Sequence, residues 1–249
     1  MIDIVKHFFR DIESIRGYMD EGTDFECPFD TDPWEWLDFA AENLKKESPH
    51  ANADALSNTK RALDCELDFF IHCYGLANIA KVPPWATGRK IRLASDLGLA
   101  PESILQRLNA ARNQLEHHYE MPSPITASNA HEIVTLFVTA VDLFLYPTRV
   151  GTMFHPRSSH EDSEGLHLRI VHEESMIYVE CPADGTIDGL GIRASDSLDE
   201  YLYLLGFILH SQRLYAKNPA KFFRRLKYYR RFHENDQSDA PNEDEAKHP

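Results

Sequence analysis

The chain has 249 residues, of which 43% are hydrophobic and 11% aromatic, enough to build a substantial core as one large domain or two small ones. With 26 basic and 40 acidic residues the formal net charge is −14, which argues against a general nucleic-acid coat protein. The four cysteines form no Cys-x-x-Cys pair and are too sparse for a disulfide framework, which indicates reduced thiols.

The sequence shows no sign of a membrane or secretory segment. The N-terminus carries Asp3, Asp11 and Glu13 and lacks the long apolar core of a signal peptide. No apolar run approaches the ~20 residues of a membrane span. We therefore expect a cytoplasmic protein with no membrane partner.

Residues 1–52 are expected to form an N-terminal unit of helices with an acidic stretch. Residues 2–18 predict a short amphipathic helix. Between Asp20 and Glu42 there are nine acids and no Lys or Arg, and Asp32 with Pro33 resembles an N-cap and first-turn pair. This stretch is interpreted either as the solvated face of a short helix or as a site for a basic partner.

Residues 53–148 predict an antiparallel helical bundle, with helices over 53–78, 101–120 and 129–146 joined by short connections. The apolar stripe of the first consists of Leu56, Leu63, Leu67, Phe70 and Tyr74. The stripes of the other two consist of Ile104, Leu108, Ala111 and Leu115, and of Ile133, Phe137, Ala140 and Phe144. Cys65, Cys73 and His72 share the first helix, but without further ligands at metal spacing they indicate packing, and no metal site is expected.

After about residue 150 the hydrophobic period changes from helical to alternating. Residues 166–181 predict two strands joined by a turn at "HEES", and Ser197 with Glu200 predicts a capping box that opens a helix. Residues 149–216 are therefore expected to form a small α+β unit, followed by a basic aromatic helix over 217–233 and a disordered acidic tail over 234–249. The predicted fold class is mainly α, a helical bundle with a small C-terminal α+β unit.

The segment 217–231 contains seven Lys or Arg and no acid, with aromatic residues between them. Its candidate RNA-binding residues are Lys221, Arg224, Arg225, Lys227, Arg230 and Arg231. Basic side chains attract phosphates, and the aromatic rings would stack on unpaired bases. The alternative is a packed helix with a solvated basic face.

The stretch "NAARNQLEHHYEMP", residues 109–122, gathers seven polar or ionisable side chains within nine residues of a predicted helix. In the simplest interpretation Arg112 and Glu116 make an ordinary i, i+4 surface pair, and the histidines complement the helix dipole. The order of residues also fits a second interpretation. Arg112 is followed directly by the polar Asn113. His117 comes five positions after Arg112, and Tyr119 comes two positions after His117.

This order resembles the signature of the HEPN family, and its His-x-Tyr ending looks like that of HEPN toxins paired with nucleotidyltransferase antitoxins. The resemblance covers roughly residues 53–146 and implies a HEPN-like antiparallel bundle. It implies a homodimer with two copies of the motif facing a shared cleft, and a metal-independent endoribonuclease without a cofactor. It also implies a toxin or a stress or phage-defence effector, with an antitoxin or another protein as partner.

The chemistry implied by the resemblance assigns a role to each residue of the HEPN-like motif, defined here as Arg112, Asn113, His117 and Tyr119. Attack of a 2′-hydroxyl on the adjacent phosphate builds up negative charge, which Arg112 would stabilise. His117 would move protons, Asn113 would orient the phosphate or the imidazole, and Tyr119 would bind phosphate or accept a nucleotidyl group. Glu116 departs from this pattern because it brings negative charge beside Arg112. The alternative function is a non-catalytic HEPN-like module for dimerisation or for protein or nucleic-acid binding.

Overall fold

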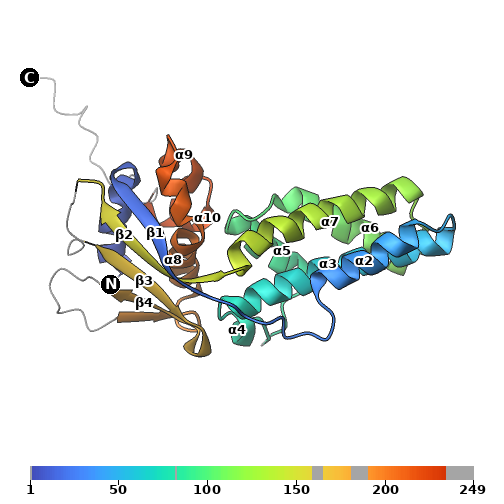
Figure 1. The fold of residues 1–249 in the computed structure, drawn as a ribbon, viewed down its shortest axis with the longest axis horizontal. Coiled ribbons are helices and arrows are strands. Elements are labelled where there is room, and N and C mark those ends of the chain that lie inside the picture. The colour runs from blue at the N-terminus through green and yellow to red at the C-terminus, as the bar shows by residue number, and fades with distance from the viewer. Residues whose placement is uncertain (1, 82, 159–164, 181–189, 234–249) are drawn as a thin grey trace, which may run out of the picture.

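Five strands form one antiparallel sheet in the order β1-β2-β3-β4-β5 at one end of an elongated molecule, and long helices form the other end (Figure 1). The computed structural model describes residues 2–81, 83–158, 165–180 and 190–233. The predicted tail, 234–249, lies outside the described residues. Helices predominate, but the sheet is substantial, so the expected class of mainly α with only a small C-terminal α+β unit is wrong and the fold is mixed α+β.

The main cause of this error is β1 (Ile15–Thr23), which lies where a helix was expected. The predicted helix over 2–18 ends early, as α1 (Ile2–Phe8) followed by the 3-10 helix η1 (Phe9–Ser14). β1 pairs antiparallel with β2 (Thr148–Pro156), with register shifts near Glu21. The first 23 residues therefore belong with the sheet, whereas α2 (Pro33–Leu44) belongs with the bundle, which divides the expected unit 1–52.

The remaining strands follow the predicted alternation more closely. β3 (Leu166–Val171) and β4 (Met176–Glu180) are joined by η3 (His172–Glu174), as the "HEES" turn predicts, and β5 (Leu190–Arg193) pairs with β4. Alternate residues of β3 are buried, which leaves one face of the sheet for the core.

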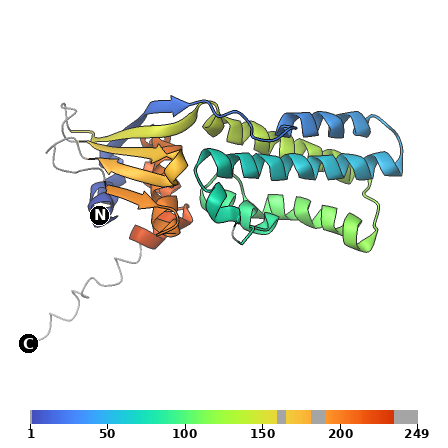
Figure 2. The ribbon, with the colours of Figure 1, turned by 90° about the horizontal axis from the view of Figure 1, so that it is seen from below.

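Helix α8 (Leu198–His210) covers that face of the sheet, as the orange helix beside the strands in Figure 2 shows. Phe207 of α8 stacks on Phe9 with ring centroids 3.7 Å apart, and Phe154 of β2 contacts Phe9 edge-on. The predicted Ser197 capping box is absent, because Ser197 occupies the N-cap position without a side-chain hydrogen bond. η4 (Ser211–Tyr215), α9 (Pro219–Phe223) and α10 (Lys227–His233) complete this sheet unit.

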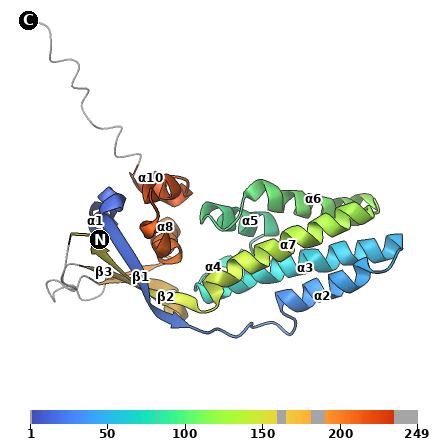
Figure 3. The same ribbon diagram turned by 45° about the horizontal axis from the view of Figure 1, so that its top comes forward.

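The bundle is built on α3 (Pro49–Cys73), whose predicted stripe is confirmed, since all five of its residues are buried. α2 packs along α3 and begins with the predicted Asp32 cap, which forms a capping box with Glu35. α4 (Ala77–Lys81), α5 (Thr87–Asp96), α6 (Glu102–His118) and α7 (Pro124–Leu145) follow in the chain. The other helices of the bundle therefore pack around α3 on more than one side (Figure 3).

The buried stripe of helix α7 is shifted by about one residue along the sequence from the predicted stripe. It buries Val134, Phe137, Val141 and Leu145, while the predicted Ile133, Ala140 and Phe144 are only partly buried. α7 is the one helix among the described residues that is long and apolar enough to cross a membrane. One side of it packs along α3 and α2.

The bundle and the sheet unit meet where α5 ends against α8 and α10. The ring nitrogen Nε2 of the buried His210 donates to the Leu97 carbonyl at 2.7 Å, and burial lowers the pKa of His210 to about 4. Gly98 follows with a φ of +76° and lets the amide of Leu99 donate to the Ala94 carbonyl at 2.9 Å, which completes a Schellman cap.

Replacing Gly98 by alanine is expected to lower the free energy of unfolding by about 1–3 kcal/mol. A Cβ there would lie 2.6 Å from Cδ2 of Leu226, on a backbone that L-residues rarely adopt. Urea unfolding would measure the loss. Gly88→Ala is the matched control, because Gly88 lies inside α5 and its Cβ would meet only Gln106 at 3.7 Å. Equal losses in both variants would contradict this account of the junction.

Candidate functional site

The HEPN-like motif occupies the last two turns of α6, at the end of the bundle far from the sheet (Figure 1). Leu105 and Leu108 anchor the helix on α3. The helix ends at Tyr119, which adopts the left-handed conformation with a φ of 58°. The amides of Tyr119 and Glu120 both donate to the Gln114 carbonyl, so a closed turn fixes the end of the helix.

The motif side chains are accessible to solvent. Arg112 and Asn113 are half-buried, His117 is exposed, and Tyr119 is 86% exposed. Arg112 forms an ion pair with Glu116, the i, i+4 contact that the simplest interpretation of the sequence predicts. The guanidinium therefore already has an anionic partner within its own helix.

Within one chain the motif does not converge on a point. Arg112 and His117 are five residues apart, which places them about 140° apart around the helix axis. Asn113 and His117 are four residues apart and share one exposed side of α6. The arrangement thus brings together Arg112 with Glu116, and Asn113 with His117, but not Arg112 with His117.

A groove beside the motif was not predicted from the sequence. It has a volume of about 570 Å³ and lies between the α2–α3 connection and the α6–α7 connection, with Lys46, Pro49, Met121 and Pro122 in its walls. These two loops are far apart in the sequence, so no local pattern indicates that they meet. Their prolines indicate only that each loop contains a turn. The groove therefore has an apolar lining with one basic and one acidic side chain, Lys46 and Glu47, and Met121 in its wall follows two residues after Tyr119.

The six candidate RNA-binding residues are all exposed, and they lie on or just after the short helices α9 and α10 rather than on one helix. The aromatic residues between them point the other way, since Phe223, Tyr228 and Tyr229 are buried. The expectation that these rings stack on bases is therefore wrong for those three residues, and the alternative of a packed helix with a basic face describes the segment better. Lys227 pairs with Asp96, and Arg231 with Asp199.

The interior of the bundle holds acidic and thiol groups whose pKa values are shifted by burial. Both oxygens of Glu66 are buried without a hydrogen-bond partner among the described residues, and burial, with Asp142 and Asp32 nearby, raises its pKa well above the usual range. Burial also raises the pKa of Cys65 and of Cys73 to about 12, so both are poor nucleophiles. Among the described residues no three His, Cys, Asp or Glu side chains are grouped to hold a metal ion.

A second polar cluster lies on the sheet face away from α8. The imidazole of His167 lies between two carboxylates, with Nε2 2.9 Å from Asp20 and Nδ1 3.3 Å from Glu180. Arg169 reaches the same Glu180 carboxylate at 3.5 Å. The sequence did not suggest this cluster, because Asp20 had been expected outside the sheet.

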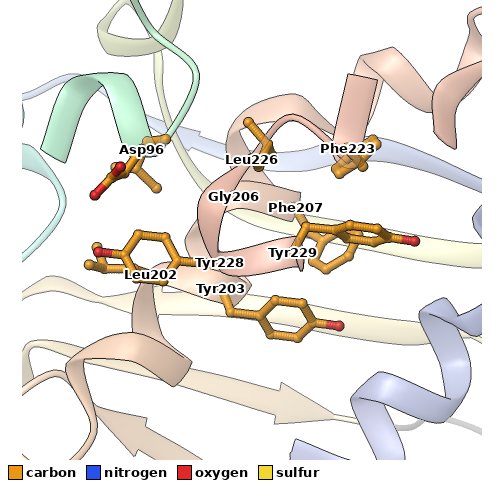
Figure 4. Close-up of a pocket in the computed structure, with 10 residues that line it drawn as sticks. Asp96, Leu202, Tyr203, Gly206, Phe207, Phe223, Leu226, Tyr228 and Tyr229 are labelled. Atoms are coloured by element: carbon orange, nitrogen blue, oxygen red, sulfur yellow. The ribbon is translucent and has the colours of Figure 1, made fainter. Parts of the chain in front are cut away.

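The enclosed cavity drawn in Figure 4 is too small for a ligand. Phe207, Phe223 and Tyr229 line it from α8, α9 and α10, and its volume is about 10 Å³. A single water needs roughly 10–15 Å³ and at least two polar partners. This cavity is a packing defect of the aromatic core.

Comparison of the chain with family models, with curated proteins and with solved structures gave no match in any of the three. The resemblance of Arg112, Asn113, His117 and Tyr119 to the HEPN signature is thus not tested by these comparisons.

Proposed function

We propose that this protein is a HEPN-type endoribonuclease that cleaves RNA as a homodimer, as a toxin or as a stress or phage-defence effector in the cytoplasm. The observation that carries the proposal is the placement of Arg112, Asn113 and His117 on accessible faces of the last two turns of α6, at the free end of the bundle. Such a position leaves room for a polymer to approach from solvent. A partner protein such as an antitoxin would restrain the activity in the cell.

The reaction needs a proton acceptor, a proton donor and a cationic group around one phosphate. The 2′-oxygen bonds to phosphorus while its proton passes to an imidazole, and the bond from phosphorus to the 5′-oxygen breaks as that oxygen takes a proton from a second imidazole. Arg112 stabilises the charge on the phosphorane oxygens. The products carry a 2′,3′-cyclic phosphate and a 5′-hydroxyl.

Arg112 and His117 of one chain point to different sides of α6. In a homodimer one subunit could supply the guanidinium and the other the imidazole of the same site. Incubating the purified protein with end-labelled RNA in EDTA, followed by analysis of the fragment ends, tests the proposal. Fragments with cyclic phosphate ends support it. Intact RNA in the presence of a dimer, across diverse substrates, counts against it.

Helix α7 offers a surface for the second copy. Ile125, Leu136 and Leu143 are each more than 70% exposed. Spacings of 11 and 7 residues place them on one line along the helix. A row of exposed aliphatic residues along one helix offers apolar surface that a second copy could cover. We name these three residues the α7 stripe.

The double substitution of Leu136 and Leu143 by glutamate is expected to convert the dimer to a monomer without unfolding it, because both side chains are already in solvent. Light scattering coupled to gel filtration would measure the mass. Ile4→Glu is the control, since Ile4 is half-exposed on α1, away from the bundle. A dimer that survives the double substitution would place the interface elsewhere.

A non-catalytic module is the second candidate, and the Arg112–Glu116 ion pair favours it. A guanidinium that is neutralised within its own helix attracts a phosphate less strongly. In this case dimerisation through the α7 stripe persists while RNA stays intact, and substitutions at Arg112 and His117 leave the cellular role unchanged.

A further inference from the structure

A cleft between the bundle and the sheet unit has the size of a small-ligand site. Its lining residues come mainly from α5 on one side and from α8 and α10 on the other. Figure 3 shows where these helices lie in the fold. Its volume is about 370 Å³. Sites for small molecules usually measure roughly 300–1,000 Å³ and occur preferentially between structural units. This cleft is separate from the HEPN-like motif, which lies at the other end of α6.

The bundle wall of the cleft carries two arginines with few anionic partners. Arg89 lies over the ring of Trp85, 4.2 Å from its centroid, and no carboxylate among the described residues lies within ion-pair distance of it. Arg92 is 62% exposed and reaches Glu102 only at 3.5 Å. The two guanidinium groups are three residues apart on α5, so they face the same side of the helix.

The other charged residues of the cleft are paired. Lys227 of α10 reaches across to Asp96 at the end of α5, with Nζ 2.8 Å from the carboxylate, and Arg231 neutralises Asp199 at the rim. The cleft therefore keeps an excess of positive charge from α5, in a chain whose formal net charge is −14. This excess of positive charge attracts a small anion.

The start of α8 adds to the attraction for an anion. Leu198 and Asp199 line the cleft, and the N-cap residue Ser197 makes no side-chain hydrogen bond. The first amides of this 13-residue helix are then available to an oxyanion, and the helix dipole favours negative charge there. The Asp199 carboxylate opposes this effect, but its ion pair with Arg231 offsets it.

The cleft also has an apolar part. Leu93, Leu198 and Leu202 contribute aliphatic surface, and Tyr228 contributes an aromatic ring. The pKa of Tyr228 is raised by burial and then by Asp96 and Asp199, so its hydroxyl keeps its proton at neutral pH and can donate to a ligand. A ligand that fits carries a compact anionic group and a flat, weakly polar group.

We propose that this cleft binds a nucleoside monophosphate, with Arg89 and Arg92 holding the phosphate and the base lying against Tyr228 and the leucines. The inference does not depend on ribonuclease activity. A guanidinium fork matches a phosphate in two parallel hydrogen bonds, and the leucines bury one face of a planar base.

Isothermal titration calorimetry of the full chain with the four nucleoside 5′-monophosphates tests the proposal. We expect saturable binding of at least one of them, and binding of the corresponding nucleoside and of inorganic phosphate that is at least about tenfold weaker. No saturable binding of any monophosphate up to millimolar concentration overturns the proposal. Binding no tighter than that of inorganic phosphate overturns the assignment of the base.

Variants locate the binding in the cleft. Arg92→Ala is expected to weaken the monophosphate about tenfold or more without affecting folding, because its side chain is largely in solvent. Arg89→Lys keeps the charge beside Trp85 but loses the fork, and a comparable weakening is expected. Arg61→Ala is the matched control, because Arg61 lies over Trp36, 5.0 Å from its centroid, in a pair outside the cleft. Unchanged affinity in both cleft variants, or an equal loss in Arg61→Ala, overturns the assignment.

Discussion

Replacing His117 by alanine is expected to lower the rate of RNA cleavage by about 100-fold or more, while the thermal unfolding of the protein stays unchanged. The proposed reaction moves one proton from the 2′-hydroxyl and another to the 5′-oxygen, and an exposed imidazole is the group suited to both transfers near neutral pH. Arg112→Ala is expected to cost about 100- to 1,000-fold, since it removes the charge opposite the phosphorane. Single-turnover cleavage of labelled RNA measures both losses.

The same helix provides matched controls for this experiment. His118 and Arg107 are exposed on α6 but outside the motif, so His118→Ala and Arg107→Ala should cleave at the wild-type rate. Glu116→Gln releases the guanidinium of Arg112 from its ion pair and should raise the rate. Cleavage that persists in both Arg112→Ala and His117→Ala would assign the activity to another site or to a contaminant.

Replacing Glu66 by glutamine is expected to stabilise the protein at pH 7, against the usual trend for a buried position. Glu66 is 1% exposed in the middle of α3, and its carboxylate is enclosed without a partner among the described residues. Burial raises its pKa, with Asp142 of α7 and Asp32 at the start of α2 adding to the effect. Each pKa unit of such a shift corresponds to about 1.4 kcal/mol of lost stability once the unfolded chain is ionised.

Because the pKa of Glu66 is raised on folding, the stability gained by Glu66→Gln depends on pH. Below the unfolded pKa of about 4.3 the carboxyl is protonated in both states and contributes no pH dependence. As pH rises above that value the unfolded state ionises first, so the wild-type protein loses stability until the folded pKa is passed. The advantage of Glu66→Gln should therefore be about 1–3 kcal/mol at pH 7 and fall toward zero near pH 4.

Urea unfolding of both proteins between pH 4 and pH 8 measures this difference. Glu42→Gln is the control, because Glu42 is an exposed carboxylate on α2 and its substitution should change little at any pH. If Glu66→Gln is less stable than the wild type by an amount that does not vary with pH, folding does not raise the pKa of Glu66 and the account is contradicted.

Local periodicity in the sequence was a good guide to individual helices and a poor guide to how segments far apart meet. The stripe from Leu56 to Tyr74 predicted α3 because these apolar residues recur at helical spacing, although the structure also buries residues on the other sides of the helix. The residues of β1 include two glycines and two acids, Asp20 and Glu21, so they carry little strand signal of their own. That strand exists because β2, far along the chain, supplies its hydrogen-bonding partner.

Helix α7 shows a different limit of sequence patterns. It is apolar on more than one side, so stripes through Ile133 and through Val134 were both compatible with a bundle. Only the position of α3 decides which side is covered. The same limit applies to the candidate site. The sequence placed Arg112 and His117 on one helix, but which of them faces solvent depends on what packs against that helix.

The pairing of Thr23 with Thr148 has a consequence for how the two halves of the molecule are connected. The chain leaves the sheet at the end of β1 and returns at the start of the adjacent β2. The helices α2 to α7 are therefore an insertion between two strands that a short hairpin turn could otherwise join. The backbone of such an insertion requires only that its two ends stay as close as adjacent strands. Changes at the far end of the helical arm, away from the His210 contact with the Leu97 carbonyl, therefore leave the strand ladder unaltered.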